Sequence, residues 1–205
     1  MTSSPVVSLF VSLLVIVNPA LAVPVYLNLT RQCTARQRHA IALTAAAAVA
    51  GILAIAALFG TEILALLSIT VDALRAAGGV LVILLAIDLL WPRPAAPTAS
   101  EDAEAQSPAI VPIAFPLLAG PGSIAVVISA AADYPGWAAR GLIGVVIGGV
   151  ALVALVGLLL AAPIYRLLGD TGLDVLSRLM AMVLLGVGIE MLVVGLGGSL
   201  PGLTR

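Results

Sequence analysis

The sequence predicts an all-α membrane protein with six transmembrane helices, and the composition and the spacing of the charges support this prediction. Hydrophobic residues make up 62% of the 205 residues and charged residues 9%, and the mean hydropathy is +1.23. A soluble domain is closer to half apolar and a quarter charged. Because a surface this apolar needs lipid around it, we expect the chain to be embedded in a bilayer.

Charged residues divide the chain into apolar runs that are long enough to cross a bilayer core, which takes about 20 helical residues. The predicted spans are 5–29, 40–59, 73–91, 109–132, 141–162 and 179–196. Residues 92–108 are rich in proline, alanine and acidic side chains, and they predict a linker that cannot bury enough apolar surface to become ordered. The chain therefore divides into a first three-helix unit (1–91), the linker and a second three-helix unit (109–205).

The distribution of arginine predicts the orientation. The loops after the first, third and fifth spans contain six arginines, namely Arg31, Arg36, Arg38, Arg93, Arg166 and Arg178. The opposite side has three, namely Arg75, Arg140 and Arg205. Because cytoplasmic loops carry an excess of Lys and Arg, we expect both termini to lie outside.

The two halves of the chain resemble each other when one is shifted by 102 positions. The shift aligns Pro19 with Pro121, Asp72 with Asp174, Leu74 with Leu176, and Asp88 with Glu190. Because three is an odd number of spans, the second unit must enter the membrane in the opposite orientation to the first. Such inverted repeats are typical of secondary transporters, whose substrate site lies at the repeat interface near the midplane.

Helix-breaking residues occur near the middle of the first and the fourth span. They are Asn18-Pro19 in the first and Gly120-Pro121-Gly122 in the fourth. Proline inside a helix costs about 3 kcal/mol, and the carbonyls that it frees cannot face lipid. We therefore expect both helices to break near the midplane. Matched interruptions point to a transporter site, and a pair of purely structural kinks is the alternative.

Several longer segments carry a family resemblance: 18–24 with 29–30, 75–79 running on to Asp88, 112–122, and 169–172 through 178–180. They resemble the MarC family of membrane proteins, also described as a six-helix neutral amino-acid transporter family. The resemblance covers nearly the whole chain apart from the linker. It implies a protein of the bacterial or archaeal plasma (inner) membrane that transports small neutral amino acids such as glycine and alanine. The family usually has a glycine shortly after the first Asn-Pro, where this chain has Ala20-Leu21-Ala22. Leu21 would narrow any space there, so the resemblance does not define the identity of the substrate.

The broken spans offer a site for the carboxylate of an amino acid. Half-helices that start after the two prolines present unpaired N–H groups and positive dipole ends. The side chains of Asn18 and Ser123 can add neutral hydrogen bonds, and a role as helix caps only is the alternative for both. We expect the breaks to converge on a small polar cavity. The predicted substrate-binding residues are Asn18, Pro19, Gly120, Pro121, Gly122 and Ser123.

Asp88 and Glu190 are the acidic residues deepest in the predicted spans, where a charge costs about 2.5–3.5 kcal/mol. Snorkelling to the interface is the alternative for Asp88, whereas Glu190 can bind an ammonium group or take part in proton coupling. If the third and sixth helices are neighbours, Arg75 reaches Glu190 and Arg178 reaches Asp88. Pairing of each arginine with an aspartate three or four residues before it is the alternative.

Other classes of function are disfavoured. The net charge of −1 provides no basic face for nucleic acid. The single histidine, His39, makes a metal site improbable, and the single cysteine, Cys33, excludes an intramolecular disulfide. With no catalytic motif we expect neither an enzyme nor a cofactor. The expected partners are the bilayer and a small zwitterionic solute. The sequence does not decide whether a proton or a sodium ion is coupled to transport, or whether the chain forms a homo-oligomer. A channel or a non-transporting lipid-binding scaffold is the main alternative, and an intramembrane enzyme a lesser one.

Two further features predict local structure. The stripe of Gly141, Gly144 and Gly148 puts small residues on one helix face, which predicts close helix contact within one chain or between chains. Asp170 and Asp174 are expected to lie in a solvated loop.

Overall fold

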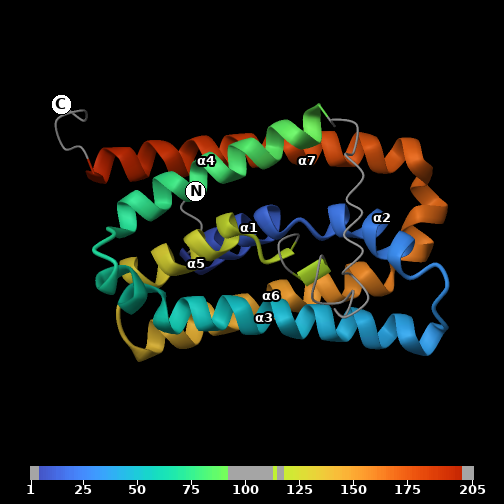
Figure 1. Cartoon of the computed structure of the whole chain (residues 1–205), viewed down its shortest axis with the longest axis horizontal. Helices are drawn as coiled ribbons and strands as arrows, with labels where there is room; N and C mark the ends of the chain where they lie inside the picture. Colours follow the sequence, from blue (N-terminus) through green and yellow to red (C-terminus); the bar gives the residue numbers. More distant parts are fainter. Residues whose placement is uncertain (1–4, 92–112, 115–117, 200–205) are drawn as a thin grey trace.

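The computed structural model describes residues 5–91, 113–114 and 118–199, and within these ranges the regular structure is helical, without strands (Figure 1). This confirms the all-α class. The helices are α1 (Pro5–Val17), α2 (Pro19–Leu29), α3 (Ala35–Leu66), α4 (Val71–Leu90), α5 (Pro121–Asp133), α6 (Trp137–Leu159) and α7 (Ala161–Ser199). The predicted linker, 92–108, lies outside the described residues.

Four helices are long and apolar enough to cross a membrane: α3, α4, α6 and the Thr171–Ser199 part of α7. They correspond to the second, third, fifth and sixth predicted spans. The first span is divided into α1 and α2, and the described part of the fourth contains α5 and a π-type turn in which the Ala119 N–H donates to the Ala114 carbonyl at 2.7 Å. The six-helix inverted repeat itself stays a prediction.

Local capping moves the start of α3. Thr34 is its N-cap: the Thr34 hydroxyl accepts from the Gln37 N–H at 3.3 Å, and the Gln37 side chain accepts from the Thr34 N–H at 2.8 Å. This reciprocal capping box satisfies two backbone donors. The helix therefore begins at Ala35, before the predicted start at residue 40.

The start of the last span also differs from the prediction. Gly169 has φ = 63°, which interrupts α7, and glycine adopts this left-handed conformation without the steric penalty of a Cβ. The long part of α7 then begins at Thr171. The prediction that Asp174 lies in a loop is therefore wrong, since it is an exposed residue on this helix.

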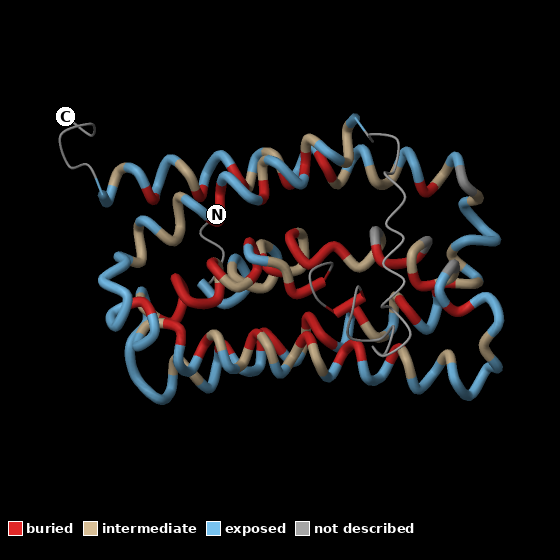
Figure 2. The backbone as a smooth tube through the Cα atoms, in the orientation of Figure 1, coloured by how far each residue is buried: buried red, intermediate tan, exposed pale blue. Residues whose placement is uncertain are grey.

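The helices form three layers (Figure 1). α4 packs on α7, α3 packs on α6, and α1, α2 and α5 lie between these pairs. Buried residues concentrate in the middle layer and on the faces turned toward it (Figure 2). Large apolar side chains on the outer faces are exposed, for example Leu43 at 60% and Val145 at 71%. An exposed apolar exterior is what a helix bundle in lipid requires, because lipid rather than water surrounds it.

Glycines bring the backbones of α4 and α7 close together. A Cβ built on Gly79 would lie 2.6 Å from the carbonyl oxygen of Gly188, and one built on Gly195 would lie 2.5 Å from the backbone nitrogen of Ala76. We call this contact, formed by Gly79, Gly188 and Gly195, the glycine seam. Small residues let helices in lipid approach in this way.

The glycine stripe on α6 behaves differently. A Cβ built on Gly141, Gly144 or Gly148 would meet nothing within 4 Å among the described residues, and all three are exposed. Close contact of this stripe with another helix is therefore not found within the described part of this chain.

Candidate functional site

The first predicted break is present. α1 ends at Val17, α2 begins at Pro19, and Asn18 between them has φ = 41°. Asparagine is among the few residues that visit the left-handed region readily. The Asn18 backbone N–H donates to the Leu14 carbonyl at 2.9 Å. Its side chain is 4% exposed, and Nδ2 has no hydrogen-bond partner in the described structure.

At the second predicted break the structure describes the start of α5. Gly120 is the N-cap in an extended conformation, and Pro121 is the first helical residue, where proline's missing N–H costs nothing. The Ser123 hydroxyl donates to the Gly120 carbonyl at 2.8 Å. The Ser123 side chain thus has a hydrogen-bond partner within the first turn of the helix, which agrees with the alternative that it acts only locally at the helix start.

The structure brings the two breaks together. A Cβ built on Gly122 would lie 3.4 Å from Cγ2 of Ile16, two residues before Asn18, and would overlap Cγ2 of Val82 on α4. Packed side chains therefore occupy the space in front of Gly122. Pro19 lies beside α6 instead, since its Cβ is 3.3 Å from the Cβ position of Gly157.

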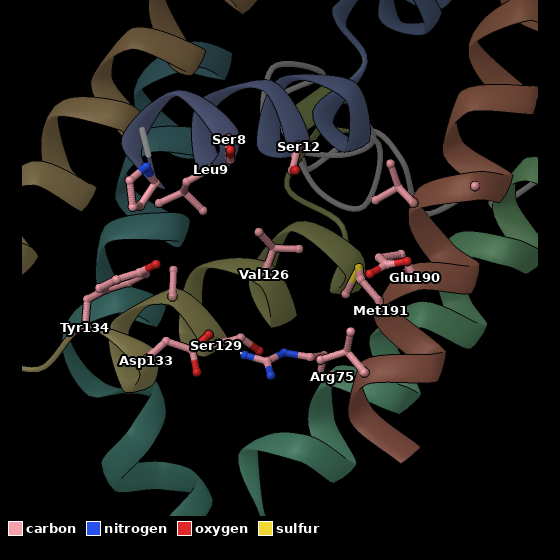
Figure 3. Close-up of a pocket in the computed structure, with 15 residues that line it drawn as sticks. Ser8, Leu9, Ser12, Arg75, Val126, Ser129, Asp133, Tyr134, Glu190 and Met191 are labelled. Atoms are coloured by element: carbon pink, nitrogen blue, oxygen red, sulfur yellow. Dashed lines mark hydrogen bonds and ion pairs between the residues drawn. The ribbon is translucent and has the colours of Figure 1, made fainter. Parts of the chain in front are cut away.

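An open cavity of about 690 Å³, lined by both polar and apolar residues, lies further along α5 (Figure 3). Ser129, on its wall, follows Gly122 by seven residues, about 10 Å along a helix. The wall is formed by α1 and α4 of the predicted first unit and by α5 and α7 of the predicted second unit. It consists of Pro5, Ser8, Leu9, Ser12, Arg75, Val126, Ser129, Ala130, Asp133, Tyr134, Gly186, Val187, Glu190, Met191 and Val194.

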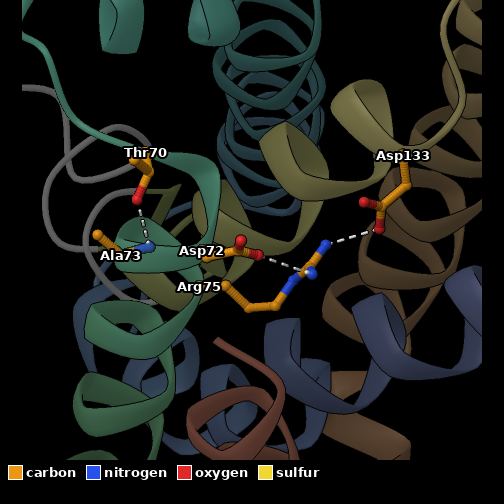
Figure 4. Close-up of polar contacts among 5 residues, drawn as sticks. All are labelled: Thr70, Asp72, Ala73, Arg75 and Asp133. Atoms are coloured by element: carbon orange, nitrogen blue, oxygen red, sulfur yellow. Dashed lines mark hydrogen bonds and ion pairs between the residues drawn. The ribbon is translucent and has the colours of Figure 1, made fainter. Parts of the chain in front are cut away.

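Arg75 is tied to two carboxylates at this cavity (Figure 4). Its guanidinium lies 2.6 Å from Oδ2 of Asp133 at the end of α5, and 3.6 Å from Oδ1 of Asp72 on its own helix. Thr70 caps this helix, its hydroxyl accepting from the Ala73 N–H at 3.1 Å. The Arg75 side chain is only 15% exposed, so the pair links α4 of the first unit to α5 of the second.

Within the described ranges Arg75 pairs with Asp133 and Asp72, and its predicted pair with Glu190 is not found there. The local alternative is therefore right in part. Sequence reasoning missed Asp133 because it falls just beyond the predicted fourth span. The predicted topology places Asp133 and Arg75 at the same end of the molecule, and this shared position could have indicated the pair.

The other charged candidates do not form a single site. Glu190 lines the cavity, whereas Asp88 and Arg178 do not. Arg178 is exposed on α7 and has no ion pair with any described residue, so its predicted pair with Asp88 is not found. Twelve residues separate it from Glu190, about 18 Å along the helix.

Sequence reasoning also missed Ser129. This residue is 5% exposed, it lines the cavity, and its hydroxyl has no partner in the described structure. Its spacing of four residues from Asp133 puts both on one face of α5, which is the available signal. The cavity wall therefore contains an arginine paired with carboxylates, a second acidic residue and a serine whose buried hydroxyl has no partner among the described residues.

Within the described residues, an all-α fold with four apolar spans, a lipid-compatible exterior and an open cavity between its helices defines a polytopic integral membrane protein. The chain belongs to the MarC family, because the sequence model of that family, described as MarC family integral membrane protein, matches residues 3–200. The resemblance inferred from the sequence is thereby confirmed.

Relatives from bacteria and archaea cover nearly the whole chain. The UPF0056 membrane protein YhcE of Escherichia coli strain K12 is 37% identical, over 95% of this chain and 93% of the relative. The UPF0056 membrane protein YvbG of Bacillus subtilis strain 168 is 37% identical over the full length of both. The UPF0056 membrane protein MJ1677 of Methanocaldococcus jannaschii is 32% identical, over 93% of this chain and 95% of the relative. No solved structure matches the chain.

Proposed function

We propose that this protein is a secondary transporter of a small solute, a small neutral amino acid such as glycine or alanine, and that it works by alternating access between two inverted three-helix repeats. The cavity carries the proposal. Its wall combines α1 and α4 of the first unit with α5 and α7 of the second, and transporters built from inverted repeats bind their substrates between the repeats.

The helix packing supports an inverted repeat. The helices at equivalent positions of the two units pack on each other, α3 on α6 and α4 on α7. A two-fold axis between the units would produce this pairing. The interruptions at Asn18-Pro19 and Gly120-Pro121 also occupy equivalent positions and lie close together.

The charge distribution supports an orientation with the cavity at the outer end. Arg31, Arg36 and Arg38 lie in or beside the α2–α3 connection, and Arg166 and Arg178 lie in the first half of α7, after the α6–α7 connection. Arg75 and Arg140 lie near the starts of α4 and α6. Figure 1 shows these two helix starts at the end of the molecule opposite the two connections. Exposed tryptophans, Trp91 after α4 and Trp137 at the start of α6, suit the two interfaces. We therefore propose a plasma (inner) membrane protein with both termini outside.

The broken helices remain our candidate for the carboxylate site. The N–H groups at the start of α5 and the unpartnered amide of buried Asn18 are the groups that such a site would use. Because Gly122 is packed against Val82, we propose that this site opens only in another state of the access cycle. A proton or a sodium ion supplies the coupling.

Purified protein in liposomes tests the proposal with radiolabelled glycine and alanine. We expect uptake that saturates with substrate concentration and is accelerated by unlabelled substrate on the opposite side. Flux at channel rates without saturation would favour the channel alternative. The absence of flux for both amino acids, with folded protein in the liposomes, would refute the proposal.

A further inference from the structure

We infer that a second cavity binds the phosphate of an anionic phospholipid such as phosphatidylglycerol, with Arg38 as its main ligand. The cavity has a volume of about 340 Å³ and is lined by α2, the start of α3, the end of α6 and the start of α7. It lies at the end of the bundle with the α2–α3 and α6–α7 connections (Figure 1). It shares no residue with the cavity around Arg75. The inference goes beyond the proposed function and does not depend on transport.

Backbone carbonyls hold the Arg38 side chain in place at this cavity. Its Nε donates to the Thr30 carbonyl at 3.0 Å, and its Nη2 donates to the Arg31 carbonyl at 3.2 Å. The hydroxyl of buried Tyr26 donates to the Arg38 carbonyl at 2.8 Å. Because a guanidinium has five N–H donors, the two side-chain bonds leave three for other partners. An arginine whose position is already fixed suits phosphate, whose oxygens match its planar fork of donors.

The positive charge at the cavity has no carboxylate against it. Arg31, Arg36 and Arg38 form no ion pair within the part of the chain that the structure describes. The two segments that supply the wall, 19–61 and 134–169, contain no Asp or Glu. His39, which also lines the cavity, is a further group that can carry positive charge. Neutral carbonyls fix Arg38 without cancelling its charge, so the cavity attracts an anion.

The start of α3 favours an anion at the same place. Ala35, the first residue of this helix, lines the cavity. The capping box between Thr34 and Gln37 satisfies part of the backbone donors here, and the other N–H groups of the first turn have no partner inside the helix. These groups and the positive end of the helix dipole attract phosphate. The helix start thus supports the same ligand as the fixed guanidinium of Arg38.

The apolar side of the wall favours a lipid over a free phosphate ion. Leu27 on α2 and Leu158 on α6 line the cavity, and so does Leu159, which is 40% exposed on the exterior of the bundle. The cavity therefore adjoins the surface along which acyl chains lie. Basic pockets between membrane helices bind acidic lipid head groups in this way. A free phosphate ion would gain nothing from the leucines.

Three probes separate the charge of the head group from the acyl chains: dioctanoyl phosphatidylglycerol, dioctanoyl phosphatidylcholine and inorganic phosphate. Calorimetry measures their binding to the purified, delipidated protein in an uncharged detergent. We expect phosphatidylglycerol to bind. Phosphatidylcholine should bind at least about tenfold more weakly, because its quaternary ammonium group meets the like charges of the arginines, and inorganic phosphate more weakly still. Arg38→Gln should weaken the binding of phosphatidylglycerol by about tenfold or more.

A second variant keeps the bonds of Arg38 intact. Ala35→Glu adds a carboxylate at the first helical residue, where an acidic side chain favours the helix, and this carboxylate competes with the phosphate for Arg38. It should weaken the binding of phosphatidylglycerol by about fivefold. Ala40→Glu is the matched control, because it adds the same charge at an exposed residue of α3 that does not line the cavity. It should leave binding unchanged.

Thermal melting identifies any variant that does not fold, and Ala35→Glu decides the test if Arg38→Gln is lost in this way. Equal binding of the two lipids would overturn the inference, and so would unchanged binding of phosphatidylglycerol in the folded variants. Inorganic phosphate that binds as tightly as phosphatidylglycerol would show a site for a free anion and overturn the assignment to a lipid. Equal weakening by Ala40→Glu and Ala35→Glu would show a general effect of charge and overturn the assignment to this cavity.

Discussion

Several pairs of helices join the predicted first unit to the predicted second unit, and two of these pairs differ in how closely their backbones approach. α4 and α7 meet along the glycine seam, where an added Cβ on Gly79 would lie 2.6 Å from a backbone oxygen. α1 and α5 both adjoin a break; they approach each other at Ile16 and Gly122, and further along α5 they line the cavity. The closed contact is thus formed by α4 and the Thr171–Ser199 part of α7, which meet through glycines, and the open one by the two helices beside the breaks, which carry serines and charges.

The difference shows that glycine has two roles in this fold. At the seam it is needed because backbone atoms of a neighbouring helix occupy the space of a side chain. On α6, Gly144 has open space in front of it among the described residues. The composition of a helix therefore does not reveal which of its glycines are needed for packing.

Breaking the seam should have the largest effect. Gly195→Leu would place a side chain against backbone atoms of Ala76 and Asp72, and overpacking of this kind costs about 3 kcal/mol. We expect a clearly lower melting temperature in detergent and less folded protein after size-exclusion chromatography. The matched control is Gly144→Leu on the open face, which should melt like the wild type; equal melting of the two variants would show that the seam is not closely packed.

A smaller effect is expected at the break in the first span. Asn18→Ala should destabilise the protein by about 1–2 kcal/mol, because alanine pays the steric cost of the left-handed conformation, whereas Asn18→Gly should not. Denaturant titration in detergent compares the two variants, and equal stability would contradict a strained backbone at this residue. If the Asn18 amide binds the substrate, Asn18→Gly should still weaken binding by about 1–3 kcal/mol.

The ion pair between α4 and α5 should have the smallest effect. Asp133→Asn removes one charge from a pair whose aspartate side chain is 52% exposed, and Asp72 continues to hold Arg75. Exposed pairs contribute about 0–1 kcal/mol, and salt screens them. We therefore expect a small decrease in melting temperature at low ionic strength that shrinks at high ionic strength. A loss independent of salt would indicate a packing role for Asp133.

The class of the fold and the positions of the breaks could be predicted because they depend on local chemistry. A long run of apolar residues predicts a membrane span whatever its neighbours are, because the length and the hydropathy of the run are sufficient. A proline predicts an interrupted helix at its own position, because it has no N–H to donate. The chain is therefore interrupted at Asn18-Pro19 as expected, and a helix begins at Pro121. Starts of helices were less predictable, because Thr34 and Gly169 act through side-chain capping and a single backbone angle rather than through hydropathy.

The partners of the cavity residues could not be predicted from the sequence. Arg75 and Asp133 are 58 residues apart, and a choice between Asp133 and Glu190 requires the relative rotation of three helices. Ser129 looks like any other helix serine until its missing hydrogen bond is seen. Hydrophobic pattern and residue spacing contain neither kind of information.

The glycine seam also limits which parts of the molecule can move. α4 belongs to the first unit and α7 to the second, so a backbone contact between them fastens the two units together along most of α4. We therefore expect alternating access to use movements within each unit rather than a swing of each unit as a whole. We expect α4 and α7 to stay together as one rigid unit while α1 and α5 pivot beside it, with Asn18 and Gly120 as their hinges. The opening and closing of the cavity would then depend on rotation about two backbone positions.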